Sequence, residues 1–182
     1  MHRPCHATGR NRGYSLYELL VVIAILTILA TVGLPSMRRL HAAGELRAAT
    51  SLLVVGLQRA RADALMSGRE TVLCPSANGH QCMDGSDWSG GWILYRDLNR
   101  NHRFDAVEPL LLSQALQAGR VRVRSNDGRR RVIYRRLGEA AGSNVTFVLC
   151  NRDLPGRGVR VIVANSGRVR LVHRPADDGC QS

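Results

Sequence analysis

Arginine is the residue type in this sequence with the clearest potential for chemistry. The chain has 182 residues, with 26 basic residues against 14 acids, and every basic residue is arginine. From Arg120 to the C-terminus there are 14 arginines and 5 acids. A guanidinium group keeps its charge and binds phosphate oxygens through two parallel hydrogen bonds. The net charge of +12 therefore indicates an anionic partner such as nucleic acid, acidic lipid or polysaccharide.

Several of these arginines alternate with apolar residues in short segments, at 121–124, 159–163 and 168–172. A β-strand sends successive side chains to opposite faces, so each segment would place its arginines on one face and its apolar side chains on the other. Two or three such strands side by side would build an arginine-rich face. We expect Arg122, Arg124 and Arg160 to contribute to it.

A second candidate site lies in a polar segment near the middle of the chain. Oxygen-bearing side chains occupy positions one, three, five, nine and twelve of a calcium-binding pattern: Asp97, Asn99, Asn101, Asp105 and Glu108. The sixth position, where such a loop needs glycine, is His102, and two arginines add positive charge. We interpret the segment as a polar hairpin loop, with a calcium loop as the alternative.

Motifs of catalytic sites are missing from the sequence. Serines and histidines occur without G-x-S-x-G or H-E-x-x-H spacing, and no glycine-rich phosphate loop is present. We therefore predict that the protein is not an enzyme and needs no cofactor.

The N-terminal region predicts a short leader followed by a long helix. Residues 1–13 contain three arginines and no acid, and an apolar run extends from Leu19 to Leu34. Glu18 would join this run inside hydrocarbon, where a carboxylate is costly and marks a functional position. Apolar residues recur at three- and four-residue steps from Leu46 to Ala64, beyond Pro35. We predict one helix from about Ser15 to Met66.

Beyond Gly68 the chain changes to short β-like runs separated by turn-rich segments. The predicted strands are Thr71–Cys74, Trp92–Tyr95, Leu110–Leu112, Arg120–Arg124, Arg131–Tyr134, Val145–Cys150, Val159–Val163 and Val169–Val172. One long helix followed by many antiparallel strands predicts an α+β fold. The expected parts are a leader at 1–13, a membrane helix at 14–35, its amphipathic half at 36–68, and a β-rich head at 69–182.

The segment Gly13-Tyr14-Ser15-Leu16-Tyr17-Glu18-Leu19-Leu20 resembles the cleavage and methylation motif of type IV prepilins and type II secretion pseudopilins. The resemblance implies that a prepilin peptidase cuts between Gly13 and Tyr14, and that Tyr14 becomes the N-methylated first residue. It also implies that Glu18 pairs with the positive terminus of a neighbouring subunit during assembly. Tyr14 departs from the family, which usually has phenylalanine after the glycine.

Two further segments resemble the FimT/GspH type of minor pilins. The first segment is residues 87–99, which begins with Asp87-Trp-Ser-Gly-Gly-Trp and ends with Asp97-Leu-Asn. The second runs from Ser166 to Arg170. Within that group, FimT-like minor pilins of transformable bacteria carry a C-terminal Gly-Arg-x-Arg motif implicated in DNA binding. Gly167, Arg168 and Arg170 match it. The resemblance implies that the glycine permits a turn and that both arginines contact phosphates.

Removal of the leader would leave four cysteines in a head outside the cytosol, where disulfides persist. We prefer the pairs Cys74–Cys82 and Cys150–Cys180. The spacing alone leaves the other two pairings open. Zinc held by His80 and Cys82 is a further alternative, although no C-x-x-C pair is present.

Together these features predict a minor type IV pilin that binds duplex DNA without sequence preference during uptake in natural transformation. Its partners would be DNA, other major and minor pilins, and the prepilin peptidase. We expect a single-pass inner-membrane protein with a periplasmic head that later enters the filament or its tip. The alternatives are a GspH-like minor pseudopilin of a type II secretion system and a structural subunit that primes pilus assembly.

Overall fold

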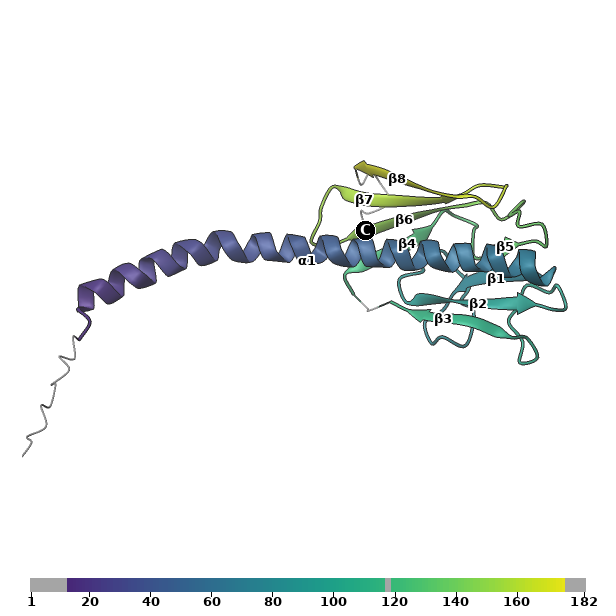
Figure 1. Cartoon of the computed structure of the whole chain (residues 1–182), viewed down its shortest axis with the longest axis horizontal. Coiled ribbons are helices and arrows are strands. Elements are labelled where there is room, and N and C mark those ends of the chain that lie inside the picture. The colour runs from purple at the N-terminus through teal and green to yellow at the C-terminus, as the bar shows by residue number, and fades with distance from the viewer. Residues whose placement is uncertain (1–12, 117–118, 176–182) are drawn as a thin grey trace, which may run out of the picture. The chain divides into compact units, whose positions relative to one another are not determined.

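The computed structural model describes residues 13–116 and 119–175. The chain divides into two units, Met1–Arg38 and Arg39–Ser182, which we describe separately. A single helix, α1 (Leu16–Ser67), supplies the regular structure of the first unit and continues into the second (Figure 1). The predicted helix is therefore confirmed to within one residue at each end.

The first unit is an apolar helical segment. An 18-residue window of α1 has a mean hydropathy of 2.5, so by length and composition this helix can cross a membrane. Large apolar side chains such as Ile23 and Leu26 are exposed in the isolated chain. Pro35 lies inside α1 without ending it.

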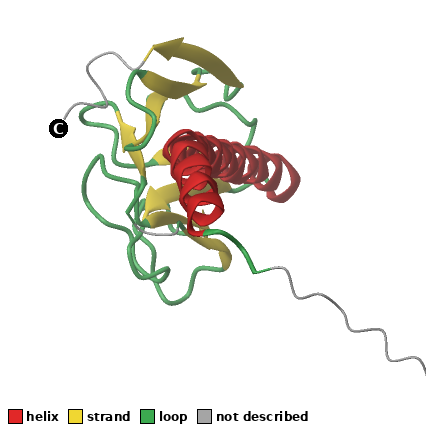
Figure 2. Cartoon of the chain, turned by 90° about the vertical axis from the view of Figure 1, so that its left-hand side faces the viewer, coloured by secondary structure: helices red, strands yellow, loops and turns green. Residues whose placement is uncertain are grey.

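The second unit, which we call the head, contains two four-stranded antiparallel sheets. Sheet A has the order β3-β2-β1-β5, and sheet B has the order β4-β6-β7-β8. The strands are β1 (Glu70–Pro75), β2 (Gly91–Asp97), β3 (Leu110–Ala115), β4 (Val121–Ser125), β5 (Val132–Tyr134), β6 (Val145–Asn151), β7 (Arg157–Val163) and β8 (Val169–Pro175). These eight strands match the eight predicted runs and confirm the α+β fold. Figure 2 shows the strands of both sheets curving around the helix.

The main core of the head forms where α1 meets the inner faces of the sheets. The predicted apolar stripe of the helix is buried, with Leu53, Leu57, Ala60 and Ala64 fully enclosed. These side chains pack in one cluster with inner residues of sheet B such as Phe147. Removing apolar area of this extent from water is the main source of stability for a domain of this size.

The helix ends at a glycine turn that starts the head's first strand. Gly68 adopts a positive φ of 63°, and its N–H donates to the Ala64 carbonyl at 3.1 Å. Glycine reaches this left-handed conformation without the steric cost of a Cβ. The helix thus ends one residue beyond its predicted end at Met66.

Candidate nucleic-acid interface

Sheet B separates apolar from cationic side chains in β4 and β7, where buried residues alternate with more exposed ones. In β4, Val121 and Val123 are buried, while Arg122 is half-buried and Arg124 is exposed. In β7, the residues on the helix side are likewise buried and Arg160 is half-buried. The inner face therefore completes the core, and the outer face carries arginine.

Strand register brings the arginines of different strands to that same outer face. Arg124 of β4 and Arg160 of β7 both lie opposite Val148 of β6. Ile162 of β7 lies opposite Arg170 of β8. Directly opposed residues in an antiparallel pair point to the same side of the sheet. We call the resulting set the arginine stripe: Arg122, Arg124, Arg160, Arg168 and Arg170.

The arginine stripe crosses sheet B diagonally. Arg122 lies on the edge strand β4, and Arg168 immediately precedes β8, the edge strand on the opposite side of the sheet. Strand rise and spacing place these two positions about 20 Å apart along the strands and about 14 Å apart across them. The stripe therefore spans about 25 Å, the length of about seven base pairs of duplex DNA.

Gly167 shapes the hairpin that presents Arg168 and Arg170. Its φ is +75°, and its N–H donates to the Ala164 carbonyl at 2.8 Å. A Cβ at this position would lie 1.9 Å from the carbonyl oxygen of Gly138. The Arg61 guanidinium on α1 donates to the carbonyls of Gly138 and Ser166, at 3.0 and 3.3 Å. Only glycine fits between these groups, so the predicted turn role of Gly167 is confirmed.

The arginine stripe forms no salt bridges in the part of the chain that the structure describes, residues 13–116 and 119–175. Arg168 and Arg170 are exposed. Their charge is therefore available to an anion from solution.

One acid, Asp87, lies close to the β4 end of the stripe. Its partial burial opposes ionisation, but hydrogen bonds from Ser89 and the positive charges of Arg124 and Arg122 outweigh this effect and lower its pKa. The Ser89 N–H donates to Oδ1 of Asp87 at 2.9 Å. Asp87 therefore stays ionised beside the two arginines.

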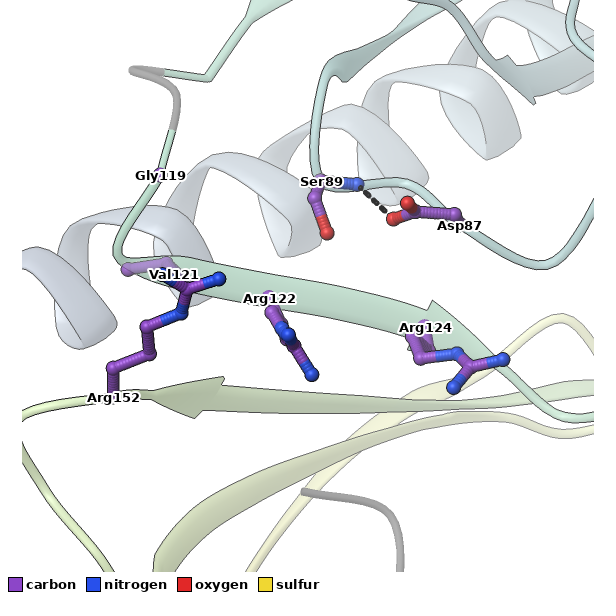
Figure 3. Close-up of a pocket in the computed structure, with 7 residues that line it drawn as sticks. All are labelled: Asp87, Ser89, Gly119, Val121, Arg122, Arg124 and Arg152. Carbon is purple, nitrogen blue, oxygen red and sulfur yellow. Dashed lines mark hydrogen bonds between the residues drawn. The ribbon is translucent and has the colours of Figure 1, made fainter. Parts of the chain in front are cut away.

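Sequence reasoning did not include Arg152 among the site residues. It follows β6 and reaches toward β4, where it lines a hollow of about 320 Å³ together with Arg122 and Arg124 (Figure 3). Arg152 lies in a turn, where alternation cannot assign a face, and its position depends on the pairing of β4 with β6. The excess of arginine after residue 120 was the signal available in the sequence.

The two tryptophans belong to the core. Trp88 and Trp92 are fully buried. Trp88 packs edge-on against Phe147, and its Nε1–H donates to the Ser125 hydroxyl at 3.2 Å. Neither ring offers a surface for base stacking, which is how single strands are commonly held.

The polar segment after β2 forms a loop closed by its own acids. Asp97 accepts backbone N–H groups from Arg100 and His102, at 2.6 and 2.9 Å. Glu108 accepts the N–H groups of Leu98 and Asp105, at 3.0 and 3.1 Å. These bonds are those of a polar hairpin loop, and the calcium alternative remains a prediction.

His102, at the sixth position of that loop, adopts a positive φ of 57° although it is not glycine. The conformation brings its Nε2 to 3.1 Å from Oε2 of Glu70. Ligand atoms of Glu70, Asp97 and His102 lie within 4.8 Å of one another, so these three side chains are the group that could hold a metal ion in the described chain.

A disulfide joins Cys74 of β1 to Cys82, which confirms the first predicted pair. Cys180, the predicted partner of Cys150, lies outside the described residues. The second pair therefore remains a prediction.

The predicted processing and assembly residues lie in the first unit. Gly13 and Tyr14 precede α1, and Glu18 lies in its first turn. Of the predicted leader, residues 1–12 lie outside the described residues.

Comparisons with known proteins agree with this architecture. Residues 49–167 match the family of the type II transport protein GspH, and residues 8–34 match the prokaryotic N-terminal methylation motif. No curated protein matches the sequence of this chain.

Solved structures of minor pilins and pseudopilins share the fold. One is the type IV minor pilin FimU of Pseudomonas aeruginosa, with 19% identity and a TM-score of 0.57 over 71% of this chain and 90% of that one. Another is the minor pseudopilin EpsH from the type 2 secretion system of Vibrio cholerae. It has 13% identity and a TM-score of 0.51 over 71% of this chain and 97% of that one.

Proposed function

Because the chain belongs to the GspH family of type IV pilin-like proteins, we propose that it is a minor type IV pilin that binds extracellular duplex DNA for uptake in natural transformation. The arginine stripe carries this proposal. Five arginines on one sheet face, without salt bridges among the described residues, form a cationic surface about 25 Å long.

Binding through this surface is electrostatic. Each arginine that neutralises a phosphate releases counter-ions, so affinity falls with salt at a slope of about −0.9 per contact. Five contacts predict a slope of about −4 to −5. Contacts to phosphate carry no sequence information, and indifference to sequence suits a protein that takes up DNA of any origin.

The N-terminal region would deliver the head to its site of action. In this proposal a prepilin peptidase cuts after Gly13 and Tyr14 is methylated. The apolar half of α1 holds the protein in the inner membrane with its head in the periplasm, and Glu18 pairs with a neighbouring pilin on assembly. Support comes from the match to the N-terminal methylation motif and from the apolar character of the helix.

A binding titration tests the proposal. The full-length protein in neutral detergent micelles is mixed with labelled duplexes of unrelated sequence, and fluorescence anisotropy is recorded at 50–200 mM NaCl. We expect equal affinity for all duplexes and the steep salt dependence given above. Absence of duplex binding by the folded protein at the lowest salt would overturn the proposal.

Two alternative functions share this fold. A minor pseudopilin of a type II secretion system is favoured by the structural likeness to EpsH, and a subunit that primes pilus assembly would use the head against acidic neighbours. Deletion of the gene separates the three. Lost transformation with intact pili supports DNA reception, lost pili support priming, and lost protein secretion supports the pseudopilin.

A further inference from the structure

A hollow of about 320 Å³ lies at one end of the arginine stripe, along the outer edge of β4. The segment before β2 forms its opposite wall, because Trp88 N–H donates to the Val123 carbonyl at 2.8 Å and Ser125 N–H donates to the Ser86 carbonyl at 2.9 Å. Figure 3 shows guanidinium groups along one side and Asp87 and Ser89 on the other. We call this feature the β4 hollow, lined by Asp87, Ser89, Arg122, Arg124 and Arg152.

Three arginine side chains line the β4 hollow. Arg122 and Arg124 project from β4, two residues apart on its outer face, and Arg152 reaches in from the end of β6 (Figure 3). Among the described residues, these three side chains form no hydrogen bond or salt bridge with another protein group. Their guanidinium donors therefore have capacity for an oxyanion.

Asp87 shows that the β4 hollow favours negative charge. Its carboxylate accepts the Ser89 N–H at 2.9 Å, and Ser89 accepts the N–H of Val123 at 3.0 Å, which fixes this wall to β4. The charges of Arg124 and Arg122 help to keep Asp87 ionised. Three guanidinium groups against one carboxylate leave a net charge of about +2, which one phosphodiester lowers without reversing it.

We propose that the β4 hollow binds one phosphate group of the DNA backbone and that Asp87 competes with this phosphate for the arginines. The proposal rests on the DNA-binding function proposed above and adds an anchoring contact at one end of the arginine stripe. The phosphate receives charge-assisted hydrogen bonds from Arg122, Arg124 and Arg152. Asp87 weakens binding because its negative charge lies beside the same groups.

Continuity with the arginine stripe identifies the ligand as a phosphodiester of a polymer. Arg122 and Arg124 belong to both features, so a backbone that enters the hollow continues directly toward Arg160 and Arg170. Free inorganic phosphate has the same local chemistry, but its binding would not depend on the arginines of the stripe that lie outside the hollow. Dependence on the stripe therefore distinguishes the two ligands.

The test compares two pairs of variants of the full-length protein in neutral detergent micelles, by anisotropy with 16-base-pair duplexes. Arg122→Gln/Arg152→Gln should lower affinity about tenfold or more and make the salt slope shallower by about 1 to 2. Arg47→Gln/Arg103→Gln removes the same charge from two exposed positions outside the hollow. This control pair should leave the salt slope unchanged.

Asp87→Asn is the more decisive variant because it should raise the affinity for DNA, whereas most substitutions in a binding site lower it. Asparagine keeps an oxygen for the Ser89 N–H but loses the competing charge, so affinity for the duplex should rise about threefold or more at 50 mM NaCl. Asp127→Asn makes the same charge change at an exposed turn residue and should raise affinity less than twofold. Circular dichroism confirms that each variant is folded.

The outcomes separate the two proposals. Failure of the wild-type protein to bind any duplex overturns the DNA-binding function and this inference with it. Duplex binding with Arg122→Gln/Arg152→Gln equal to its control, or with Asp87→Asn no better than Asp127→Asn, overturns the β4 hollow alone. A final arm follows arginine side-chain N–H signals by NMR. If inorganic phosphate shifts those of the hollow and the duplex does not, the hollow is a free-anion site and the inference is wrong.

Discussion

Sheet A and sheet B each have four strands and pack against the same helix. They differ in the face that points away from the helix, which is covered in sheet A and uncovered in sheet B. In sheet A, β1 and β2 are buried along almost their whole length, and a second cluster containing Tyr95 and Phe104 covers the face away from the main core. In sheet B, buried and half-exposed residues alternate. A face covered by its own loops adds stability, whereas an uncovered face is available for a ligand.

Charged side chains follow the same division. Next to sheet A, Arg96 pairs with Asp63, His102 lies against Glu70, and Arg131 contacts Asp84. In sheet B the arginine stripe has no salt bridge among the described residues. Arginine stabilises the fold on one sheet and remains available to an anion on the other.

Removal of the whole arginine stripe should have the largest effect on DNA binding. Glutamine at all five positions should lower duplex affinity by about a thousandfold or more at 100 mM salt, because each lost phosphate contact removes its share of counter-ion release. The free energy of unfolding should change little, since exposed substitutions usually stay within about 0.5 kcal/mol each. Anisotropy titrations and urea unfolding measure the two effects.

The matched control is Arg96→Gln/Arg131→Gln next to sheet A. Loss of these paired arginines should lower stability while the salt slope for DNA stays at its wild-type value. Equal losses of DNA affinity from the stripe and from this pair would show that only total charge matters, and the contrast between the sheets would have no functional meaning.

A substitution at Gly167 tests how the hairpin of sheet B is fixed against the neighbouring loop after β5. Gly167→Ala should destabilise the protein by about 3 kcal/mol, because the φ of +75° is strained for alanine and the added Cβ would meet the Gly138 carbonyl. Gly156→Ala is the matched control. It has the same φ and nothing within 4 Å, so only the conformational cost of about 1 kcal/mol should appear in thermal unfolding.

The sequence predicted the elements of this fold well because the local patterns are strong. The apolar spacing of α1 and the alternation in β4 and β7 each assign one buried face without knowledge of the rest of the chain. Eight short runs then became eight strands. Their grouping into two sheets was not predictable, because strand pairing depends on contacts between residues far apart in sequence.

The candidate site was predictable to the same extent. Alternation assigned Arg122, Arg124 and Arg160 to strand faces, but only the register of β4, β6 and β7 shows that these faces are one surface. Arg152 was missed as a site residue because a turn has no periodicity. The arrangement of Asp87 opposite the arginines depends on the edge contact between β4 and the segment before β2.

The protein should lose stability when the disulfide on the covered face of sheet A is removed. Replacing Cys74 and Cys82 by alanine should lower the free energy of unfolding by about 2 to 3 kcal/mol, because the cross-link restricts a short loop in the unfolded chain. Duplex affinity should be unchanged at temperatures where the variant is folded. A clear loss of affinity in a folded variant would mean that the covered face of sheet A also supports the arginine stripe.

The smallest expected effect is the pH dependence of the stability that Asp63 contributes. Partial burial opposes the charge of Asp63, but hydrogen bonds from Arg96 and Thr71 outweigh it and lower its pKa. A carboxylate with a lowered pKa in the folded state stabilises the protein fully above its ordinary value of 3.8, and this contribution is lost as pH falls through the folded-state value. Asp63→Asn should therefore cost about 1 kcal/mol at pH 7, and this cost should shrink as pH falls below 3.8.

Urea unfolding of wild type and Asp63→Asn between pH 2.5 and 7 measures that difference, with Asp127→Asn as the control. Duplex affinity should stay constant between about pH 8 and 9, above the range in which histidine ordinarily titrates, because arginine keeps its charge there. A difference between wild type and Asp63→Asn that does not shrink as pH falls below 3.8 would mean that packing around the side chain, and not its ion pair with Arg96, is what stabilises this edge of sheet A. The ion pair between Arg96 and Asp63 would then contribute little to stability. The contrast between paired arginines at sheet A and available arginines at sheet B would have no effect on the stability of sheet A.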